Sequence, residues 1–410
     1  MRTLVLNGGS SSLKAVLCDV DGGSVALRPP PPLWQARVDW GRRTAPAEIR
    51  IQTPKGERRR EMEVADPETV LRPVLESLWS GDAKAVGRPQ DIDVVGHRIV
   101  HGGKAFRESA RITPDVKAQI RRYVQFAPEH NRLELEGIEA AEKILGSDMP
   151  QVAVFDTAFH ATLSPAASTY PGPKDWIGEG IYRYGFHGIS HQYTSRRAAE
   201  VLGRPIESLR MITCHLGNGA SLAAVAGGKS VDTTMGFTPL EGLMMGTRSG
   251  TIDPGIIIHL VRNCGYRADE LDRVLNKKSG LAGLSGISGD MREVEDAMDS
   301  GNEDARLAFE VYVHRLCREI GGMLASLGGM DALVFTAGVG ENDARLRRIV
   351  CERLAFLGID LDAARNEASP VDADIAASGS KVRALVVRTE EDWEIARECY
   401  RLLNTRSNPL

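Results

Sequence analysis

The chain has 410 residues, of which 42% are apolar and 26% are charged, and its net charge at pH 7 is −4. A chain of this length exceeds what one ordinary hydrophobic core supports, so two domains are predicted. The slightly acidic charge excludes bulk binding to nucleic acid or to an anionic membrane, since both need a basic surplus. The sequence contains no apolar run of about 18 residues that could span a bilayer. We therefore expect a cytoplasmic protein without a leader segment.

The cysteines give the same indication of compartment. They stand at positions 18, 214, 264, 317, 351 and 399, and none of them forms a CxxC pair. Their spacing predicts neither a zinc site nor a disulfide framework. Free thiols inside apolar segments are typical of proteins from a reducing compartment.

The first part of the chain predicts short strands and one helix. Residues 1–20 indicate a strand, a glycine turn and a second strand, and residues 48–53 indicate another short strand. The charged segment 55–61 predicts a solvated turn. Asp66-Pro67-Glu68 predicts a helix start, because a cap, a first-turn proline and an early acid follow one another there. The apolar stripe of this helix is Val70, Leu71, Val74, Leu75 and Leu78.

Strands and helices alternate along the rest of the chain, which indicates an α/β fold. Further strands are predicted at 93–100, 152–155, 211–215, 332–336 and 384–387, and helices from 113, at 256–261, at 268–275, at 303–327 and after 392. We predict a first domain over residues 1–158, completed by a C-terminal helix at 392–410. The second domain is predicted over residues 159–391.

A glycine-rich turn occurs twice, and this repeat is the most informative feature of the sequence. One copy lies between Asn7 and Val16 and the other between His215 and Val225. The following strands, 12–16 and 221–225, align without a gap. Glycine lets backbone N–H groups approach a phosphate closely, and Lys14 with the neighbouring hydroxyls adds donors. Two related halves that clamp a polyphosphate are therefore predicted, while two ordinary β-hairpins with glycine turns remain the alternative.

The two turns and five further motifs resemble the acetate kinase family, the short-chain carboxylate kinases of the actin/Hsp70/sugar-kinase superfamily. The resemblance covers the chain nearly from end to end. In chain order the motifs are Asn7-Gly-Gly-Ser-Ser-Ser-Leu-Lys14, His97-Arg-Ile-Val-His-Gly-Gly103, Phe155-Asp-Thr-Ala-Phe-His160, Tyr184-Gly-Phe-His-Gly-Ile-Ser-His191, His215-Leu-Gly-Asn-Gly219, Met245-Gly-Thr-Arg-Ser-Gly250 and Phe335-Thr-Ala-Gly-Val-Gly-Glu-Asn342.

The resemblance implies an α/β fold of two actin-like, ribonuclease H-like domains around a central nucleotide cleft. It implies reversible, ATP-dependent phosphorylation of acetate to acetyl phosphate by direct in-line phosphoryl transfer. The implied cofactor is Mg²⁺ or Mn²⁺. The implied partners are ATP or ADP and a small carboxylate or acyl phosphate, in a homodimer without nucleic acid or membrane.

The chemistry of such a reaction calls for arginines more than for a base. A carboxylic acid is already ionised at pH 7, so the site must bring anions together and stabilise charge on the transferred group. The planar guanidinium of an arginine suits both tasks. By resemblance the catalytic residues are Arg98, Asp156, His187 and Arg248, and Arg98 and Arg248 also bind the substrate. The alternative for the arginines is an ordinary surface salt bridge.

The remaining substrate and metal residues also follow from the resemblance. Val100, Phe186 and Pro239 are expected to form the apolar wall of the acyl pocket. Asn7 and Glu391 are expected to hold the metal together with Asp156, since Mg²⁺ prefers one or two carboxylates with water and phosphate oxygens.

Two assignments near these residues stay open. Glu390 and Asp392 are close rivals of Glu391, and Glu391 could instead act only as a helix N-terminal acid. His130 matches a further active-site histidine of the family, with a transition-state or supporting role.

The expected nucleotide-binding residues lie near both turns and after later strands. They are Ser12, Lys14, His215, Asn218, Gly219, Asp290, Met291, Arg292, Gly338, Val339 and Asn342. The last three follow a strand and open a helix, which is a suitable place for phosphate and ribose. For residues 290–292 a simple helix cap with an adjacent acid and base is the alternative.

Two further patterns are interpreted as structural. His97 and His101 are four residues apart, but a strand places such residues about 13 Å apart, so this spacing does not predict zinc. Gly227-Gly-Lys-Ser230 resembles the end of a P-loop but lacks its first glycine, so a β-hairpin is predicted.

The segment around His130 departs from the family pattern. Glu129 and Arg132 stand where the family commonly has leucine and proline. A charged, unpaired glutamate in an apolar pocket is costly, so Glu129 could turn away, pair with Arg132 or polarise the pocket. A kinase for propionate, butyrate or another small carboxylate therefore stays open. An actin/Hsp70-like ATPase switch and a regulatory paralogue that only binds nucleotide stay open as well.

Overall fold

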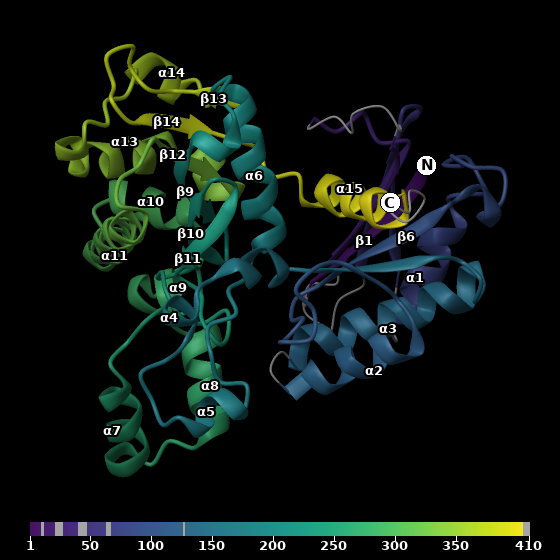
Figure 1. Cartoon of the computed structure of the whole chain (residues 1–410), viewed down its shortest axis with the longest axis horizontal. Coiled ribbons are helices and arrows are strands. Elements are labelled where there is room, and N and C mark those ends of the chain that lie inside the picture. Colours follow the sequence, from purple (N-terminus) through teal and green to yellow (C-terminus); the bar gives the residue numbers. More distant parts are fainter. Residues whose placement is uncertain (10–11, 21–27, 40–46, 63–66, 126–127, 405–410) are drawn as a thin grey trace. The chain divides into compact units, whose positions relative to one another are not determined.

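The computed structural model describes residues 1–9, 12–20, 28–39, 47–62, 67–125 and 128–404 (Figure 1). The chain divides into two compact units. Unit 1 comprises Met1–Ala158 and Glu390–Leu410, and unit 2 comprises Phe159–Thr389. The chain returns to unit 1 before Glu391, a residue that the predicted boundaries place in the second domain. That each unit is a separate folding domain stays a prediction.

Unit 1 is built on a mixed sheet with the strand order β5-β4-β3-β2-β1-β6-β8-β7. β1 pairs with β2 in the antiparallel sense and with β6 in the parallel sense, and β6 is parallel to β8. The strands are β1 (Arg2–Gly8), β2 (Ser12–Asp19), β3 (Trp34–Asp39), β4 (Ala47–Thr53), β5 (Gly56–Met62), β6 (Val94–Ile99), β7 (Ala110–Arg111) and β8 (Gln151–Phe155).

Helices cover both faces of this sheet. They are α1 (Pro67–Glu76), α2 (Pro114–Arg122), α3 (Pro128–Leu145) and α15 (Glu391–Asn404). The predicted apolar stripe on and after α1 is buried in one core with β1 to β4. α15 approaches β6 at Gly96, where a Cβ atom would lie 2.7 Å from Cys399 Sγ and 2.8 Å from Ile395. The last helix therefore belongs to unit 1, beside β1 and β6 (Figure 1).

Unit 2 has a sheet with the order β11-β10-β9-β12-β14-β13. β9 and β10 form an antiparallel hairpin, and β9, β12 and β14 run parallel. The strands are β9 (Arg210–Leu216), β10 (Ala220–Ala226), β11 (Lys229–Thr233), β12 (Ala332–Thr336), β13 (Ala373–Asp374) and β14 (Arg383–Val386).

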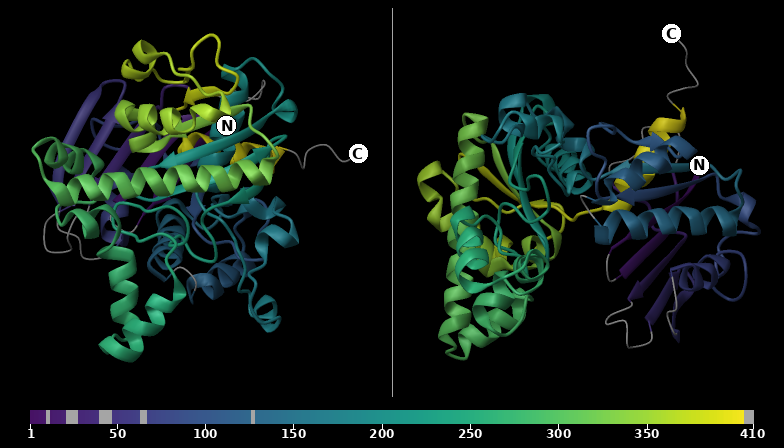
Figure 2. Two further views of the ribbon diagram at one scale, coloured as in Figure 1. Left: turned by 90° about the vertical axis from the view of Figure 1, so that its left-hand side faces the viewer. Right: turned by 90° about the horizontal axis from the view of Figure 1, so that it is seen from below.

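The longest helix of unit 2, α11 (Glu303–Leu327), packs along β9 to β11 (Figure 2). Its bounds match the predicted residues. The other helices are α4 (Pro165–Ser168), α5 (Asp175–Gly178), α6 (Gly188–Val201), α7 (Pro254–Cys264), α8 (Ala268–Lys277), α9 (Gly280–Ser285), α10 (Met291–Asp299), α12 (Ala337–Asn342), α13 (Ala344–Arg353) and α14 (Ala363–Glu367).

The two sheets share one topology. The order β3-β2-β1-β6-β8 in unit 1 corresponds to β11-β10-β9-β12-β14 in unit 2, with the same parallel and antiparallel pairings. β2 and β10, which carry the aligned segments 12–16 and 221–225, occupy equivalent places. The predicted α/β fold of two related, actin-like halves is confirmed.

Two local predictions had different outcomes. Residues 227–230 form the predicted β-hairpin, where Gly227 and Gly228 adopt φ of 57° and 78°. The prediction of a solvated turn at 55–61 was wrong, because Gly56–Met62 forms the edge strand β5 against β4. An exposed edge strand tolerates charged side chains on both faces, which hides its strand pattern. Among the described residues, no helix is long and apolar enough to cross a membrane.

Candidate functional site

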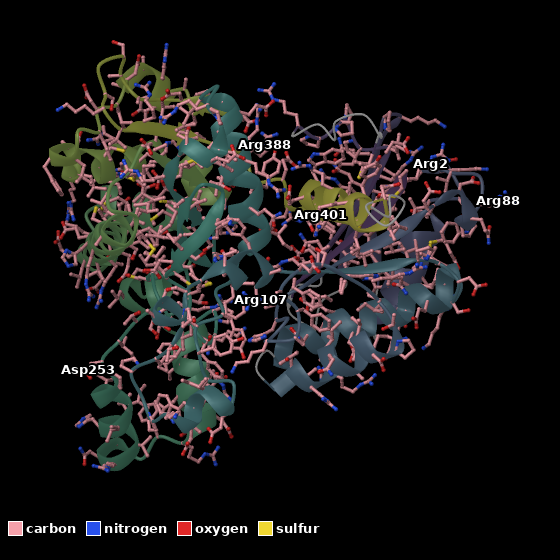
Figure 3. All side chains as sticks on the ribbon, in the orientation of Figure 1. Arg2, Arg88, Arg107, Asp253, Arg388 and Arg401 are labelled. Atoms are coloured by element: carbon pink, nitrogen blue, oxygen red, sulfur yellow. The ribbon has the colours of Figure 1, made fainter. Side chains whose placement is uncertain are left out.

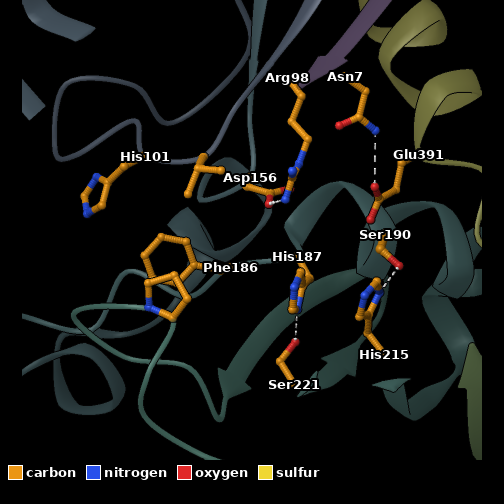
Figure 4. Close-up of polar contacts among 12 residues, drawn as sticks. Asn7, Arg98, His101, Asp156, Phe186, His187, Ser190, His215, Ser221 and Glu391 are labelled. Atoms are coloured by element: carbon orange, nitrogen blue, oxygen red, sulfur yellow. Dashed lines mark hydrogen bonds and ion pairs between the residues drawn. The ribbon is translucent and has the colours of Figure 1, made fainter. Parts of the chain in front are cut away.

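In unit 1, an arginine and an aspartate meet where two parallel strands end. Arg98 is near the end of β6, Asp156 directly follows β8, and Ile99 pairs with Phe155 in the register of the two strands. Arg98 Nη2 donates to Asp156 Oδ2 at 2.6 Å (Figure 4). The side chains of Arg98 and Asp156 are only 16% and 1% exposed. Both residues are thus held in a desolvated pair at the carboxyl edge of the sheet.

This setting separates Arg98 from an ordinary surface arginine. Arg88, labelled in Figure 3, is 74% exposed and pairs with Asp91 three residues along the chain. Burial alone would lower the pKa of Arg98, but the carboxylates of Asp156 and Glu391 outweigh burial, and the pKa is raised. Asp156 Oδ1 is buried and has no hydrogen-bond partner among the described residues. The pair therefore keeps an acceptor atom available for a further ligand.

A second group of charges lies at the start of α15. Asn7, near the end of β1, donates to Glu391 Oε2 at 3.5 Å and to Asp392 Oδ1 at 3.0 Å. Lys14 on β2 forms an ion pair with Asp392. Burial raises the pKa of Glu391, with Asp156 and Asp392 adding to the rise and Arg98 and Asn7 opposing it. The structure therefore brings together the Asn7 amide of β1 with cations from β2 and β6 and with carboxylates from α15 and from the residue after β8.

In unit 2, His187 is held by a chain of hydrogen bonds. Its Nδ1 lies 2.9 Å from Ser221 Oγ (Figure 4). Ser221 Oγ lies 2.8 Å from His191 Nε2, and His191 Nδ1 lies 2.7 Å from Thr213 Oγ1. Burial, with His160 and His215 adding to it, lowers the pKa of His191 far below its ordinary value, so this ring is neutral at pH 7. His187 itself adopts φ of 54° at the start of α6.

The directions of these bonds follow from one carbonyl group. Thr213 Oγ1 donates to the Ala223 carbonyl at 3.5 Å, so it accepts from His191 Nδ1–H. A neutral His191 then accepts the Ser221 hydroxyl proton at Nε2, and Ser221 Oγ accepts from His187 Nδ1–H. The chain of bonds thus fixes a proton on Nδ1 of His187.

The second glycine turn, between β9 and β10, brings His187 and Arg248 together. A Cβ atom at Gly219 would lie 3.4 Å from Arg248 Nη1 and 3.4 Å from His187 Nε2. Arg248 Nη1 also donates to the Pro239 carbonyl at 3.4 Å. His187 and His215 stack with ring centroids 4.1 Å apart, and His215 Nδ1 lies 2.8 Å from Ser190 Oγ. A Cβ atom at Gly219 would thus be in contact with both side chains.

The predicted adenine-side segment forms a simple helix cap, as in the second interpretation of its sequence. Asp290 caps α10 by accepting from Arg292 N at 3.0 Å, and its carboxylate pairs with Arg292 Nη2 at 2.5 Å. Met291 is buried, with 3% of its surface exposed. Of this segment, Arg292 is 87% exposed and Asp290 is 34% exposed, so both side chains remain accessible to a ligand.

The segment after β12 opens the short helix α12. Asn342 Nδ2 donates to the Gly338 carbonyl at 2.8 Å. Glu341, which the sequence prediction missed, accepts from the backbone N–H of Ala337 and of Thr389, each at 2.9 Å. Burial raises the pKa of Glu341, while these N–H groups oppose the rise. Glu341 therefore ties the ends of β12 and β14 to each other.

Each unit holds part of the predicted set. Unit 1 contains Asn7, Ser12, Lys14, Arg98, Val100, Asp156 and Glu391, and unit 2 contains Phe186, His187, His215, Asn218, Gly219, Pro239, Arg248, Asp290, Met291, Arg292, Gly338, Val339 and Asn342. The side chains of His130 and Glu129 lie outside the described part of the chain. Arg132, a possible partner of Glu129, lies 3.7 Å from Glu136. Within the described ranges, no three His, Cys, Asp or Glu side chains form a group that could hold a metal ion by themselves.

Comparisons with known proteins match this chain over nearly its whole length. The model of the acetokinase family matches residues 2–397. The acetate kinase of Gloeobacter violaceus is 55% identical over 403 residues, which cover 98% of this chain and 100% of that relative. Among solved structures, the acetate kinase of Porphyromonas gingivalis is 40% identical with a TM-score of 0.88, covering 98% of this chain and 100% of that one. A propionate kinase from Francisella tularensis is 36% identical with a TM-score of 0.88, covering 97% and 98%.

Proposed function

The chain belongs to the acetokinase family, so it is a phosphotransferase with a carboxyl group as acceptor, and we propose that it converts acetate and ATP reversibly into acetyl phosphate and ADP. The observation that carries this proposal is the meeting of Arg248, His187 and Gly219 in unit 2. Arg248 and His187 place a cationic and a hydrogen-bonding side chain beside a glycine turn of the kind that binds phosphate. The Arg98–Asp156 pair supports the same reaction from unit 1.

The proposed step is a direct in-line transfer. A carboxylate oxygen of acetate forms a bond to the γ-phosphorus of ATP, while the bond from that phosphorus to the bridging oxygen breaks and ADP leaves with the electron pair. No proton is removed from the acceptor, because acetate is ionised at pH 7. Arg98 and Arg248 bind the carboxylate and the transferred group, and their positive charge offsets the repulsion between the two anions. Val100, Phe186 and Pro239 bind the methyl group.

His187 is proposed to donate a hydrogen bond to the transferred phosphoryl group. The bond from Ser221 supports this role, because it fixes the Nδ1 proton and leaves Nε2 as the nitrogen that can face a phosphoryl oxygen. Donation from Nε2 requires the doubly protonated ring. A side chain so held is pre-oriented before the transition state forms. His130 remains a proposed supporting residue.

The residues fit a divalent cation. Asp156, Glu391 and Asn7 offer hard oxygen donors, and Asp156 Oδ1 is a buried acceptor without a partner among the described residues. We propose that these residues hold Mg²⁺ or Mn²⁺ together with water and phosphate oxygens. When bound, such an ion neutralises charge on the nucleotide phosphates. Asp392 also contacts Asn7, and its ion pair with Lys14 makes it the less available carboxylate.

The nucleotide is proposed to use both glycine turns and the segment after β12. Ser12 and Lys14 would contact phosphate from unit 1, and His215, Asn218 and Gly219 would do so from unit 2. Gly338, Val339 and Asn342 would contact the ribose and phosphate side, and residues 290–292 the adenine side. The matching strand order of the two sheets supports paired phosphate contacts, because equivalent hairpins carry the two turns.

A homodimer is proposed from the surface of α7. All of its residues are described and none is buried, although Ile256, Ile258 and Val261 are apolar and 46%, 51% and 48% exposed. Exposed apolar side chains of this kind are typical of an interface, and a second copy of the chain is the occupant that the family resemblance implies. We place the enzyme in the cytoplasm, where ATP and ADP are available to it.

A coupled assay of ADP release tests the function. The purified chain is given ATP, Mg²⁺ and unbranched carboxylates of one to six carbons, with hydroxylamine present to trap an acyl phosphate. We expect acetate to give the highest kcat/KM and a hydroxamate product. Propionate as the preferred substrate would favour the activity named for the Francisella relative. ADP release without any carboxylate dependence would contradict the proposal and favour an ATPase switch.

A further inference from the structure

The segment Val100–Gly103, which follows β6, is held mainly by side chains. Each of its backbone N–H groups donates to one. In chain order, the acceptors are Glu134 Oε2 at 3.0 Å, Asn131 Oδ1 at 3.1 Å, Thr157 Oγ1 at 3.1 Å and His101 Nδ1 at 3.0 Å. Asn131 also donates to the His101 carbonyl at 3.0 Å. The backbone N–H groups of this irregular segment are therefore satisfied by groups from α3, from Thr157 after β8 and from its own His101.

This segment controls two residues of the proposed carboxylate site. Arg98 precedes it by two residues on β6, and Val100 is its first residue. Val100 is buried, with 4% of its surface exposed, and its N–H is the group that Glu134 binds. A shift of the segment would move the backbone from which both side chains extend, and small displacements of positioned groups are costly in catalysis.

Glu134 is an unusual hydrogen-bond acceptor for the Val100 N–H, because it is a carboxyl group in a mainly apolar environment. Only 7% of its surface is exposed, and Oε1 has no hydrogen-bond partner among the described residues. Glu134 lines a cavity of about 50 Å³ with Arg98 and His97, and its other walls are mainly leucines and glycines. Burial raises the pKa of Glu134 to about 8, although Arg98 and the Val100 N–H oppose the rise. The carboxyl group is therefore mostly neutral at pH 7.

We propose that Glu134 is a positioning residue for the carboxylate substrate, which fixes Val100 and the Arg98-bearing end of β6 without adding a negative charge beside the arginine. This inference rests on the proposed function, because it assumes that Arg98 binds the substrate carboxylate. Glu134 acts through the Val100 backbone and does not touch the substrate.

The neutral state of Glu134 matters because of the charges around it. Arg98 faces it from β6, and Asp156 adds a negative charge after β8. His97 adds no charge, because burial lowers its pKa to about 4. An ionised Glu134 would thus be a second carboxylate near an arginine that already binds Asp156. It would compete with the substrate for the positive charge of Arg98 and weaken carboxylate binding.

Steady-state kinetics of Glu134→Ala and Glu134→Gln at pH 7 test the positioning role. Removal of the acceptor in Glu134→Ala leaves the Val100 N–H without its partner, so the KM for acetate should rise about tenfold. The KM for ATP should not change. Glu134→Gln keeps an acceptor oxygen and should stay within about twofold of the wild type. Glu139→Ala is the matched control, since Glu139 is a carboxylate on the same helix and pairs only with exposed Arg121 among the described residues.

The pH dependence of the KM for acetate tests the charge state. In the wild type this KM should rise as the pH passes about 8, where Glu134 ionises, and in Glu134→Gln it should stay flat. Stability gives a second readout with a defined sign. Between the ordinary pKa of 4.5 and the folded value of about 8, the unfolded chain has lost a proton that the folded chain keeps. The contribution of Glu134 to stability therefore falls with rising pH in this window, and Glu134→Gln should remove that fall.

Several results would overturn the inference. One is an unchanged KM for acetate in Glu134→Ala with only a lowered melting temperature, since that is the result of a purely structural role. Another is an equal alkaline rise of this KM in the wild type and in Glu134→Gln, which decides the matter even if Glu134→Ala fails to fold. A wild type without acetate-dependent turnover would instead contradict the proposed function, and this inference with it.

Discussion

His187 illustrates how much of the site depends on residues that never touch the substrate. Its ring is oriented by Ser221, and Ser221 is in turn oriented by His191 and Thr213. Because the donor of each of these hydrogen bonds is set by the next bond, Nδ1 of His187 carries a proton. In the proposed reaction, His187 is thereby oriented before the transition state forms.

Removal of the Ser221 hydroxyl should therefore impair catalysis more than binding. In Ser221→Ala we expect kcat to fall about tenfold to 100-fold, because the loss of a group that orients an active-site histidine has effects of this size. The KM values should change little. Ser195→Ala is the control, since Ser195 is also buried in unit 2 but, among the described residues, its hydroxyl donates only to the Gln192 carbonyl. An unchanged kcat in Ser221→Ala would contradict the role given to the hydrogen-bond chain.

Some proposed site residues have a distinctive local setting, although their roles came from the family resemblance and stay predictions. Arg98 and Asp156 end neighbouring strands, and Arg248 lies between glycines. Glu134 and Ser221 could not be identified as supporting residues in this way. Their partners are 30 positions away or more, and such contacts depend on how α3 and β10 pack and not on any local pattern. The choice between Glu391 and Asp392 was equally open, because a helix start is uncertain by a residue or two.

α15 is the element that links the end of the sequence to the site in unit 1. Its first residues, Glu391 and Asp392, contact Asn7, and its buried face includes Trp393, Ile395 and Cys399. Gly96 on β6 allows this close approach. The position of two carboxylates thus depends on the packing of one helix against the sheet.

Ile395→Ala should destabilise unit 1. Ile395 is fully buried, and removal of such a side chain typically costs about 2–5 kcal/mol of unfolding free energy. We expect a lower denaturation midpoint in urea, together with weaker nucleotide affinity as α15 loosens. Asn404→Ala, at the exposed end of the same helix, should match the wild type. An Ile395→Ala variant as stable as the wild type would show that the buried Ile395 side chain does not hold α15 in place.

Elements with a strong period were predicted well, and an edge element was not. α11 and β12 have the predicted bounds because long amphipathic or fully apolar segments determine their own structure. β5 was missed because its charged residues lie on both faces of an exposed edge strand, where burial imposes no alternation. The sheet order depends on long-range pairing and was not predicted from the sequence.

At the scale of the whole molecule, each unit repeats one sheet topology and carries its own arginine. A reaction between two anions needs positive charge from more than one direction. We infer that the second unit, which repeats the topology of the first, supplies part of this charge through its arginine. The exposed apolar side chains of α7 also matter for the whole molecule, because we propose that they contact a second copy of the chain.

The proposed homodimer can be tested by placing a charged residue on α7. Ile258→Glu should convert the dimer to a monomer, because an unpaired carboxylate in an apolar interface is strongly unfavourable. The molar mass is measured by size-exclusion chromatography with light scattering. Phe356→Glu is the control, since Phe356 is apolar and 81% exposed in the same unit but outside α7. A monomeric wild type, or an Ile258→Glu variant that remains dimeric, would contradict this assignment.

The central claim is that guanidinium groups from both units serve one phosphoryl transfer, and hydroxylamine trapping of acetyl phosphate in Arg98→Ala and Arg248→Ala tests it most directly. Each variant should lose at least about 100-fold in kcat/KM for acetate while it still folds and binds ATP in calorimetry, because each removes charge stabilisation from the transition state. Arg88→Ala, a surface variant, should be unaffected. Wild-type turnover in either Arg98→Ala or Arg248→Ala would contradict the account.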